Sequence, residues 1–195
     1  MPRVTAKEKI LDSALRLFQQ DGYLSTSVDE IIADAGVSKG SFYHAFKSKE
    51  MLGIEAIEHY LAHVISVLRD GDYHQGDDPL ERVIAYIRHS ESKADELWCD
   101  GCMMGNFTTD LARHHPSVRS KLKQLFTEME SQLVALFEPM VADIDCCALN
   151  AKQLARQYLS IIQGAILLGQ AHKDIAVTKD CISSFRQLME SLRPH

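Results

Sequence analysis

Apolar residues recur at helical spacing in nearly every segment of the chain. A first helix is expected from Ala6 to about Gln20, with Gly22 as its stop. A second, short helix is predicted by apolar side chains at positions i, i+3, i+4 and i+7. Those side chains are Val28, Ile31, Ile32 and Ala35. No segment shows the strict alternation of a β-strand, so the pattern predicts an all-α protein.

The rest of the chain is expected to continue as helices with short connections. These helices are expected to begin at Ser48, Pro79, Cys102, Pro116, Ala151 and Thr178. The polar, glycine-flanked stretch 71–78 is predicted to be a loop. Pro139 should end or kink the long helix that contains it. We expect two domains, a three-helix head over residues 1–50 and a helical bundle over residues 51–195.

Two capping boxes fix helix starts near the N-terminus, at Thr5–Glu8 and at Ser27–Glu30. In each box a hydroxyl can accept from an unpaired helix amide, while the glutamate reaches back to the N–H of the cap residue. Gly36 suits the left-handed backbone of a helix end, and Ser38 can cap a third helix two residues later. This spacing is typical of a helix-turn-helix, whose second helix can enter a DNA major groove.

The helix after Ser38 is predicted to have one buried and one polar face. Phe42, Ala45 and Phe46 are expected to point inward. The residues left to face outward are Lys39, Gly40, Ser41, Tyr43 and His44. Their side chains, and the bare backbone of the glycine, suit contacts with base edges and phosphates.

Four motifs follow one another in order at residues 14–23, 26–32, 35–43 and 46–52, among them Ala35-Gly36-Val37-Ser38-Lys39-Gly40-Ser41-Phe42-Tyr43. With them, residues 5–60 resemble the DNA-binding domain of the tetracycline-repressor (TetR) family of bacterial transcription regulators. The resemblance implies that Lys39, Gly40, Ser41 and His44 lie near base edges, in a helix that starts after Ser38. It also implies that phosphates are held by Thr26, Ser27, Tyr43 and Lys49.

The last two helices carry an argument for self-association. Residues 158–168 are apolar almost all round, which is unusual for a lone surface helix. The final helix adds Cys181, Ile182, Phe185, Leu188, Met189 and Leu192. The pair could form internal core, but the resembled family places its homodimer interface here. A two-fold dimer would present two recognition helices to the half-sites of a palindromic operator in double-stranded DNA.

The segment that begins at Cys99 is the most unusual part of the body. Cys99 and Cys102 form a C-x-x-C pair, which suggests redox chemistry or half of a metal site. The adjacent residues Cys146 and Cys147 make a poor second pair for zinc, and a thioredoxin-like reading needs a βαβ setting that the chain lacks.

The same segment resembles the branch of the family whose members sense electrophiles and unsaturated small molecules through cysteine. By that resemblance Cys102 is the reactive or ligand-contacting thiol, with Lys173 as a neighbour that stabilises its anion. Trp98 and Phe107 would line the pocket beside it. The alternative is that Cys102 is simply a buried small hydrophobic residue.

Charge and composition limit the function further. The charges of residues 1–50 balance, so the formal net charge of −6 lies wholly beyond them, and DNA binding would depend on cations focused on one face. No stretch approaches the apolar length of a membrane span, and the N-terminus lacks the apolar region of a signal peptide. We therefore expect a cytoplasmic protein that contacts no membrane and has reduced thiols.

The motifs of the chain include no signature of an enzyme. The chain carries neither a P-loop nor a G-x-S-x-G elbow nor a dinucleotide fingerprint, so no catalytic residue and no cofactor are expected. His59 and His63 lie four residues apart on a predicted helix, but two ligands do not make a metal site, and no metal is expected.

The sequence thus predicts a homodimeric transcriptional repressor that a small-molecule or electrophile inducer releases from its operator. One alternative is a quorum-type or global regulator with an apolar pocket that Cys102 merely lines. A thiol redox protein that uses Cys99 and Cys102 is an alternative from another class. A protein-binding adaptor without DNA affinity is a third.

Overall fold

The computed structural model describes residues 4–144 and 150–193, and within them the chain is helical and contains no strand. The elements in order are α1 (Ala6–Gln20), α2 (Val28–Ala35), α3 (Lys39–Ala45), α4 (Lys49–Arg69), η1 (Asp72–Gln75), α5 (Pro79–Ser92), α6 (Ala94–Trp98), α7 (Met103–Leu111), α8 (Pro116–Asp143), α9 (Ala151–His172) and α10 (Ile175–Glu190). The prediction of an all-α protein with a helix-turn-helix at its N-terminal end is confirmed.

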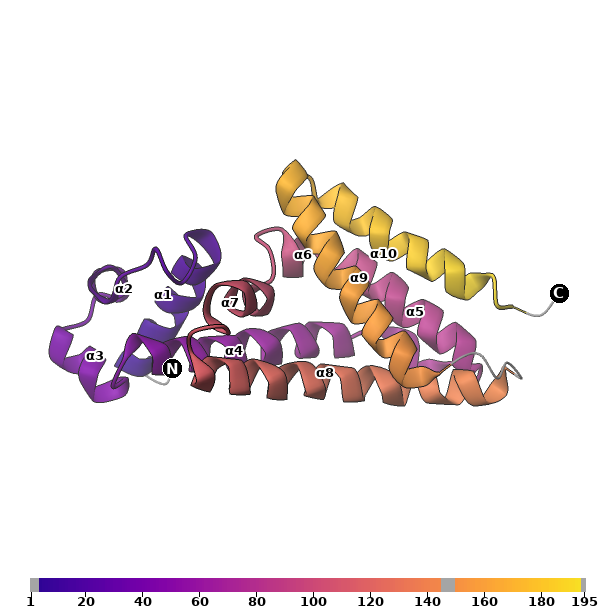
Figure 1. Cartoon of the computed structure of the whole chain (residues 1–195), viewed down its shortest axis with the longest axis horizontal. Coiled ribbons are helices and arrows are strands. Elements are labelled where there is room, and N and C mark those ends of the chain that lie inside the picture. The colour runs from indigo at the N-terminus through magenta and orange to yellow at the C-terminus, as the bar shows by residue number, and fades with distance from the viewer. Residues whose placement is uncertain (1–3, 145–149, 194–195) are drawn as a thin grey trace. The chain divides into compact units, whose positions relative to one another are not determined.

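The chain forms two compact units, and each unit is built from two separate segments. Met1–His63 and Cys102–Lys123 make up the first unit, whereas Val64–Gly101 and Gln124–His195 make up the second. Two long helices, α4 and α8, therefore begin in the first unit and end in the second. Figure 1 shows the course of the chain by colour, with α7 returning to the first unit after α5 and α6.

The first unit holds the three N-terminal helices around a small apolar core. The predicted inward side chains Ile31 and Phe42 are fully buried, and Phe46 is 2% exposed. An aromatic cluster closes this core, because the ring of Phe107 in α7 lies edge-on against the rings of Phe18 and Tyr23, with centroids 5.7 and 5.1 Å away. Helix α7 is thus a structural part of the same unit as the helix-turn-helix.

Helix α4 lies close to that cluster, at a glycine. A Cβ atom on Gly53 would lie 2.9 Å from the Tyr23 ring and 3.1 Å from the Phe107 ring, so only glycine lets both rings approach the helix this closely. Further along, α4 runs beside the start of α8, as both views show, and Lys121 pairs with Glu58 there at 2.6 Å.

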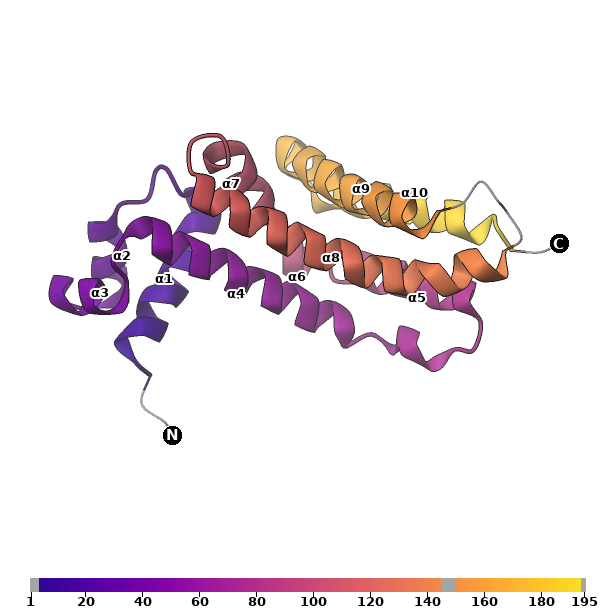
Figure 2. The same ribbon diagram turned by 60° about the horizontal axis from the view of Figure 1, so that its bottom comes forward.

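The second unit is built on the hairpin of α9 and α10, which lie side by side in Figures 1 and 2. Lys173 ends α9 with a left-handed backbone, φ 53°, and Asp174 caps α10 by accepting from the amide of Ala176. The two helices touch closely at Gly169, where a Cβ atom would lie 2.2 Å from the Thr178 hydroxyl oxygen. That buried hydroxyl donates to the Ala165 carbonyl at 3.2 Å.

Several predicted boundaries were wrong. Of the two outcomes expected at Pro139, an end or a kink of the helix, the end does not occur, because α8 runs to Asp143. Phe137 and Met140 on either side of the proline are fully buried, and their packing outweighs one lost hydrogen bond. The predicted loop 71–78 contains the 3₁₀ turn η1, which Tyr73 anchors by packing its ring against Tyr86 at 5.0 Å.

The C-terminal half brings two more differences. Helix α6 was not predicted, because five residues are too few to show a helical period. Helix α10 starts three residues earlier than expected, since Asp174 caps it. The pair Cys146–Cys147 lies outside the described residues.

The expectation that no stretch approaches a membrane span also needs correction. By length and composition alone, α4 is long and apolar enough to cross a membrane, with a mean hydropathy of 1.3 over its most apolar window. Its apolar side chains Leu52 and Ile57 are nevertheless fully buried, as in a core helix of a globular protein.

Candidate DNA-binding surface

The first two helices of the head start at the capping boxes that the sequence predicts. The Thr5 hydroxyl accepts from the Glu8 amide at 3.2 Å, and the Thr5 amide donates to the Glu8 carboxylate at 2.7 Å. Ser27 and Glu30 repeat the arrangement at 3.2 and 2.6 Å. These hydrogen bonds lower the pKa of both glutamates, so each box is fully formed at neutral pH.

The turn between α2 and α3 is fixed by two residues. Gly36 ends α2 with φ 61°, a conformation that side chains with a Cβ rarely adopt. Ser38 then caps α3, because its hydroxyl accepts from the amide of Ser41 at 3.1 Å and lies 2.9 Å from the Ser41 hydroxyl. The start of the recognition helix is therefore defined by local hydrogen bonds and needs no contact with distant parts of the chain.

Helix α3 presents the polar face that its spacing predicts. Lys39, Gly40 and His44 are exposed, Ser41 is half-buried, and Tyr43 is 45% exposed with its ring edge-on to the buried ring of Phe42. A tyrosine held in this way can present its hydroxyl to a phosphate without losing much side-chain entropy on binding.

Lys39 is the only lysine or arginine of α3, and it is only weakly engaged within the protein. Its ammonium lies 3.2 Å from the carboxylate of Asp29, but the two side chains are 65% and 78% exposed. Exposed pairs of this kind contribute about 0–1 kcal/mol. A guanine edge or a phosphate can therefore replace Asp29 at little cost.

Three of the four residues predicted to hold phosphates already have internal partners. Thr26 is 3% exposed and donates to the Gly22 carbonyl at 2.8 Å, while Ser27 caps α2. The Lys49 ammonium donates to the Tyr23 carbonyl at 2.5 Å and lies 4.1 Å from the centre of the Tyr23 ring. Partial burial lowers the pKa of Lys49, with the Glu30 carboxylate opposing the shift. These side chains stabilise the local fold through their internal hydrogen bonds, and their phosphate contacts stay a prediction.

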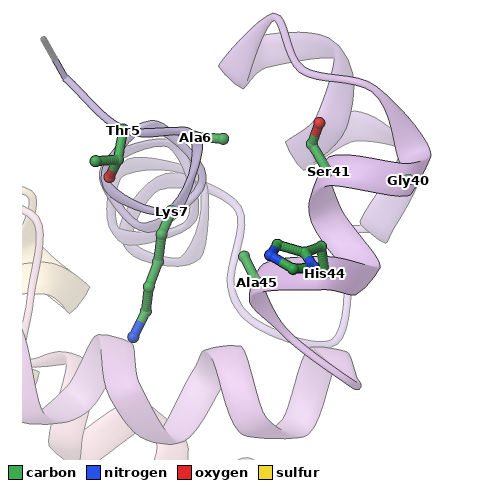
Figure 3. Close-up of a pocket in the computed structure, with 7 residues that line it drawn as sticks. All are labelled: Thr5, Ala6, Lys7, Gly40, Ser41, His44 and Ala45. Atoms are coloured by element: carbon green, nitrogen blue, oxygen red, sulfur yellow. The ribbon is translucent and has the colours of Figure 1, made fainter.

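A hollow that the sequence analysis missed lies between the start of α1 and α3. Thr5, Ala6 and Lys7 line one side of it, and four residues of α3 line the other, namely Gly40, Ser41, His44 and Ala45 (Figure 3). Lys7 pairs with Glu55 at 2.8 Å and lies 5.5 Å above the ring of Phe46. The capping box at Thr5 was visible in the sequence, but nothing there showed that α1 begins beside the recognition helix.

The predicted sensor residues fall in both units. In the first unit Cys102 occupies the N-cap position of α7 and is 6% exposed, and Phe107 belongs to the aromatic core. In the second unit Trp98 is 5% exposed in α6, and Lys173 is exposed at the end of α9. Cys102 is thus a buried thiol, and its reactivity stays a prediction.

The thiol of Cys99 is exposed, but its surroundings disfavour the thiolate. Partial burial and the neighbouring carboxylate of Asp100 raise the pKa of Cys99. A redox-active cysteine needs the opposite shift. In the part of the chain that the structure describes, no group of three or more His, Cys, Asp or Glu side chains is arranged to hold a metal ion.

A capped helix-turn-helix with an exposed polar recognition face defines a DNA-binding transcriptional regulator. Comparison with known proteins supports the same class: the model described as "Bacterial regulatory proteins, tetR family" matches residues 10–56, and the model "Tetracyclin repressor-like, C-terminal domain" matches residues 79–185. The chain belongs to the tetR family of bacterial regulatory proteins, whose members regulate transcription and are not enzymes.

Relatives match most of the chain. The HTH-type transcriptional regulator YxaF of Bacillus subtilis is 30% identical over 174 residues, which are 88% of each chain. The HTH-type transcriptional repressor DhaR of Mycobacterium sp. strain GP1 is 28% identical over 66% of this chain and 63% of its own. The structure of regulatory protein TetR from Rhodobacter sphaeroides has the same fold, with a TM-score of 0.80 at 24% identity over 93% of this chain and 97% of its own.

Proposed function

We propose that this regulator is a homodimeric, cytoplasmic repressor that binds a palindromic operator and leaves it when a small molecule binds the helical body. The observation that carries the proposal is the face of α3, which is exposed, polar and fixed by the caps at Gly36 and Ser38. A relative named as a repressor supports repression rather than activation. The proposed division is a DNA-binding head over residues 1–50 and a ligand-binding and dimerisation body over residues 51–195.

Base readout is assigned to the start of α3 and phosphate contacts to its surroundings. Lys39, Gly40, Ser41 and His44 would face base edges, next to the cap residue Ser38. The phosphate contacts would come from Thr26, Ser27, Tyr43 and Lys49. For Thr26 and Lys49, whose side chains are engaged internally, a contact with DNA would need those partners to be shared or exchanged.

Dimerisation is proposed through α9 and α10. Three large apolar side chains on these helices are exposed, with Leu167 at 67%, Leu168 at 47% and Leu188 at 49%. Leu167 and Leu168 lie near the turn between the two helices and Leu188 lies near the far end of α10. Water-exposed leucines on two packed helices favour a second copy as their partner. A two-fold dimer would also place two recognition helices about one helical turn of DNA apart.

The DNA-binding part of the proposal is tested by gel-shift with the chain's own upstream region at several salt concentrations. Tyr43→Ala should weaken binding to all sequences, whereas Lys39→Ala should also relax base preference and flatten the salt slope by about one unit. Lys152→Ala is the matched control, because Lys152 is 61% exposed and pairs with Glu130 in the second unit as Lys39 pairs with Asp29. Binding by both head variants that equals wild type would refute the assignment of α3.

The proposed response to an inducer has two versions, an electrophile sensor and an apolar pocket, and variants of Cys102 distinguish between them. If Cys102 is the sensor of electrophiles, alkylation should lower operator affinity and Cys102→Ser should abolish the response. The burial of Cys102 favours the second version, in which the pocket is apolar and the thiol only lines it, with Phe107 of the same unit. A Cys102→Ser protein that responds to electrophiles like wild type would leave only that version.

A further inference from the structure

The hollow between the start of α1 and α3 is open to solvent and is lined by small or exposed side chains. Its volume is about 640 Å³, far more than the roughly 30 Å³ that one water molecule takes up. In Figure 3 the methyl group of Ala6 and the ring of His44 extend from the two helices into this space. A molecule other than water can therefore enter between α1 and α3.

Gly40 borders the hollow, and the fold itself gives no reason for a glycine there. It lies in the first turn of α3, where a glycine makes a helix less stable than an alanine does. Its φ is not positive, and among the described residues a Cβ atom would meet only the Ser38 hydroxyl oxygen within 4 Å, at an ordinary 3.7 Å. The remaining reason for a glycine is the close approach of another molecule.

Lys7 supplies a positive charge at the edge of the hollow. Its ammonium pairs with Glu55 at 2.8 Å and lies 5.5 Å from the centre of the Phe46 ring, while the side chain is 51% exposed. A pair this exposed adds little to stability, and the lysine stem is flexible, so another anion can replace Glu55. The lining contains no carboxylate, and the carboxylate of Glu8 accepts from the amide and the hydroxyl of Thr5.

The hollow is continuous with the face of α3 to which base readout is assigned. Gly40, Ser41 and His44 belong to both. When a recognition helix lies in a major groove, the sugar–phosphate strands that border the groove run along the flanks of the helix. An open space on this flank, with a cation at its edge, is complementary in shape and in charge to such a strand.

We propose that the hollow takes up the sugar–phosphate backbone of one operator strand, and that Lys7 of α1 holds one of its phosphates from outside the helix-turn-helix. The methyl groups of Ala6 and Ala45 contact deoxyribose, and Gly40 leaves room for the strand beside α3. This inference rests on the proposed binding of DNA and deepens it, because neither Ala6 nor Lys7 is among the residues assigned to DNA there.

The first test is a gel-shift of the full-length protein with its own upstream region at several salt concentrations. Lys7→Ala should weaken binding by about tenfold and flatten the salt slope by about one unit for each head that is bound. Arg16→Ala is the matched control, because Arg16 also lies on α1, is 48% exposed and pairs with Asp34, but does not line the hollow. Its affinity should stay within about twofold of wild type.

Glu55→Gln separates a contact with DNA from a structural role of the ion pair. This variant breaks the same pair as Lys7→Ala, yet it keeps the lysine and removes the carboxylate that competes with phosphate. Its operator affinity should therefore equal that of wild type or rise by about two- to threefold. If Glu55→Gln or Arg16→Ala weakens binding as much as Lys7→Ala does, Lys7 acts through the fold and the inference is overturned.

Ala6→Leu tests the space from the side of α1. Position 6 is exposed and leucine is a good helix former, so the Tm should stay within about 1 °C of wild type. The larger side chain occupies part of the hollow, and operator affinity should fall by about tenfold. Gln20→Leu, at the exposed opposite end of the same helix, is the control and should change neither quantity. Unchanged affinity of Ala6→Leu would overturn the inference.

Ethylation of single operator phosphates locates the contact and keeps the inference separate from the proposed function. Wild type and Arg16→Ala should be blocked by ethylation of a phosphate that has no effect on Lys7→Ala, and identical patterns would overturn the inference. If wild type binds no fragment at low salt, the proposed function is lost and the inference with it. If Tyr43→Ala weakens binding as expected while Lys7→Ala does not, only the inference is lost.

Discussion

Glu50 shows at the scale of one residue how the head is tied to a later part of the chain. This carboxylate accepts from the Ser117 hydroxyl and lies 2.9 Å from Nδ1 of His115, at the start of α8. Both hydrogen bonds, that of Ser117 first, lower the pKa of Glu50 from its ordinary value of 4.5. The first turn of α4, directly after the recognition helix, is thereby held to α8 within the first unit.

The lowered pKa of Glu50 predicts acid-sensitive stability. A carboxyl whose pKa is lower in the folded state stabilises the fold fully above its unfolded value, and this stability is lost as the pH falls through the lowered pKa. We expect Glu50→Gln to lower the Tm by about 1–3 °C at pH 7, and the difference from wild type to shrink below pH 4.5. Thermal unfolding over pH 3–8, with the exposed Glu128→Gln as control, measures this. A pH-independent difference would show that the glutamine disturbs packing.

Lys49 shows what a sequence cannot reveal about a single side chain. Its place in a motif predicts a phosphate contact, yet its ammonium lies on the carbonyl and the ring of Tyr23. A phosphate contact and the internal contact with Tyr23 both need a cation at position 49. The sequence motif is therefore the same whichever of the two contacts the lysine makes. Only the folded backbone, which brings residues 23 and 49 together, shows the internal partner.

At the scale of elements, the parts that could be predicted are those that local hydrogen bonds define. Helices α1 to α3 lie where their caps place them, because Thr5, Ser27, Gly36 and Ser38 act within four residues of themselves. Pro139 within α8 and the buried Tyr73 in η1 could not be predicted, since distant packing decides both. The exposed polar face of α3 could be predicted from the spacing of its residues. The hollow beside Thr5 could not, because it depends on how the tertiary fold places α1 beside α3.

Helix α7 is expected to matter for DNA binding, although it lies far from α3 in the sequence. Phe107→Leu should lower the unfolding free energy by about 1–2 kcal/mol and also weaken operator binding, because its ring completes the core on which Phe18 and Tyr23 rest. Urea unfolding and gel-shift measure the two effects. Phe137→Leu is the control, since Phe137 is equally buried but lies in the second unit. Equal loss of DNA affinity in both variants would contradict a specific role of α7.

At the scale of the whole molecule, the proposed dimer predicts that one charge on its interface abolishes tight binding. Leu167→Glu places a carboxylate at a 67% exposed position of α9, so the fold should tolerate it while the dimer does not. Sedimentation should show a monomer, and operator affinity should fall by about 100-fold or more, because two half-sites are no longer bound together.

The control for this variant adds the same charge elsewhere in the second unit. Ser131→Glu changes an exposed position of α8 and should leave both the sedimentation and the affinity unchanged. If Leu167→Glu stays dimeric, the assembly uses a surface other than α9.

The return of the chain to its first unit has a consequence for biosynthesis. The ring of Phe107 is added to the core around Phe18 only after the ribosome has made the intervening residues, including all of α5 and α6. A nascent chain that ends after α4 therefore carries the complete DNA-reading helices on an unfinished core. Such an intermediate should be a substrate for proteases and chaperones until translation has passed α7, and a truncated gene would produce it permanently.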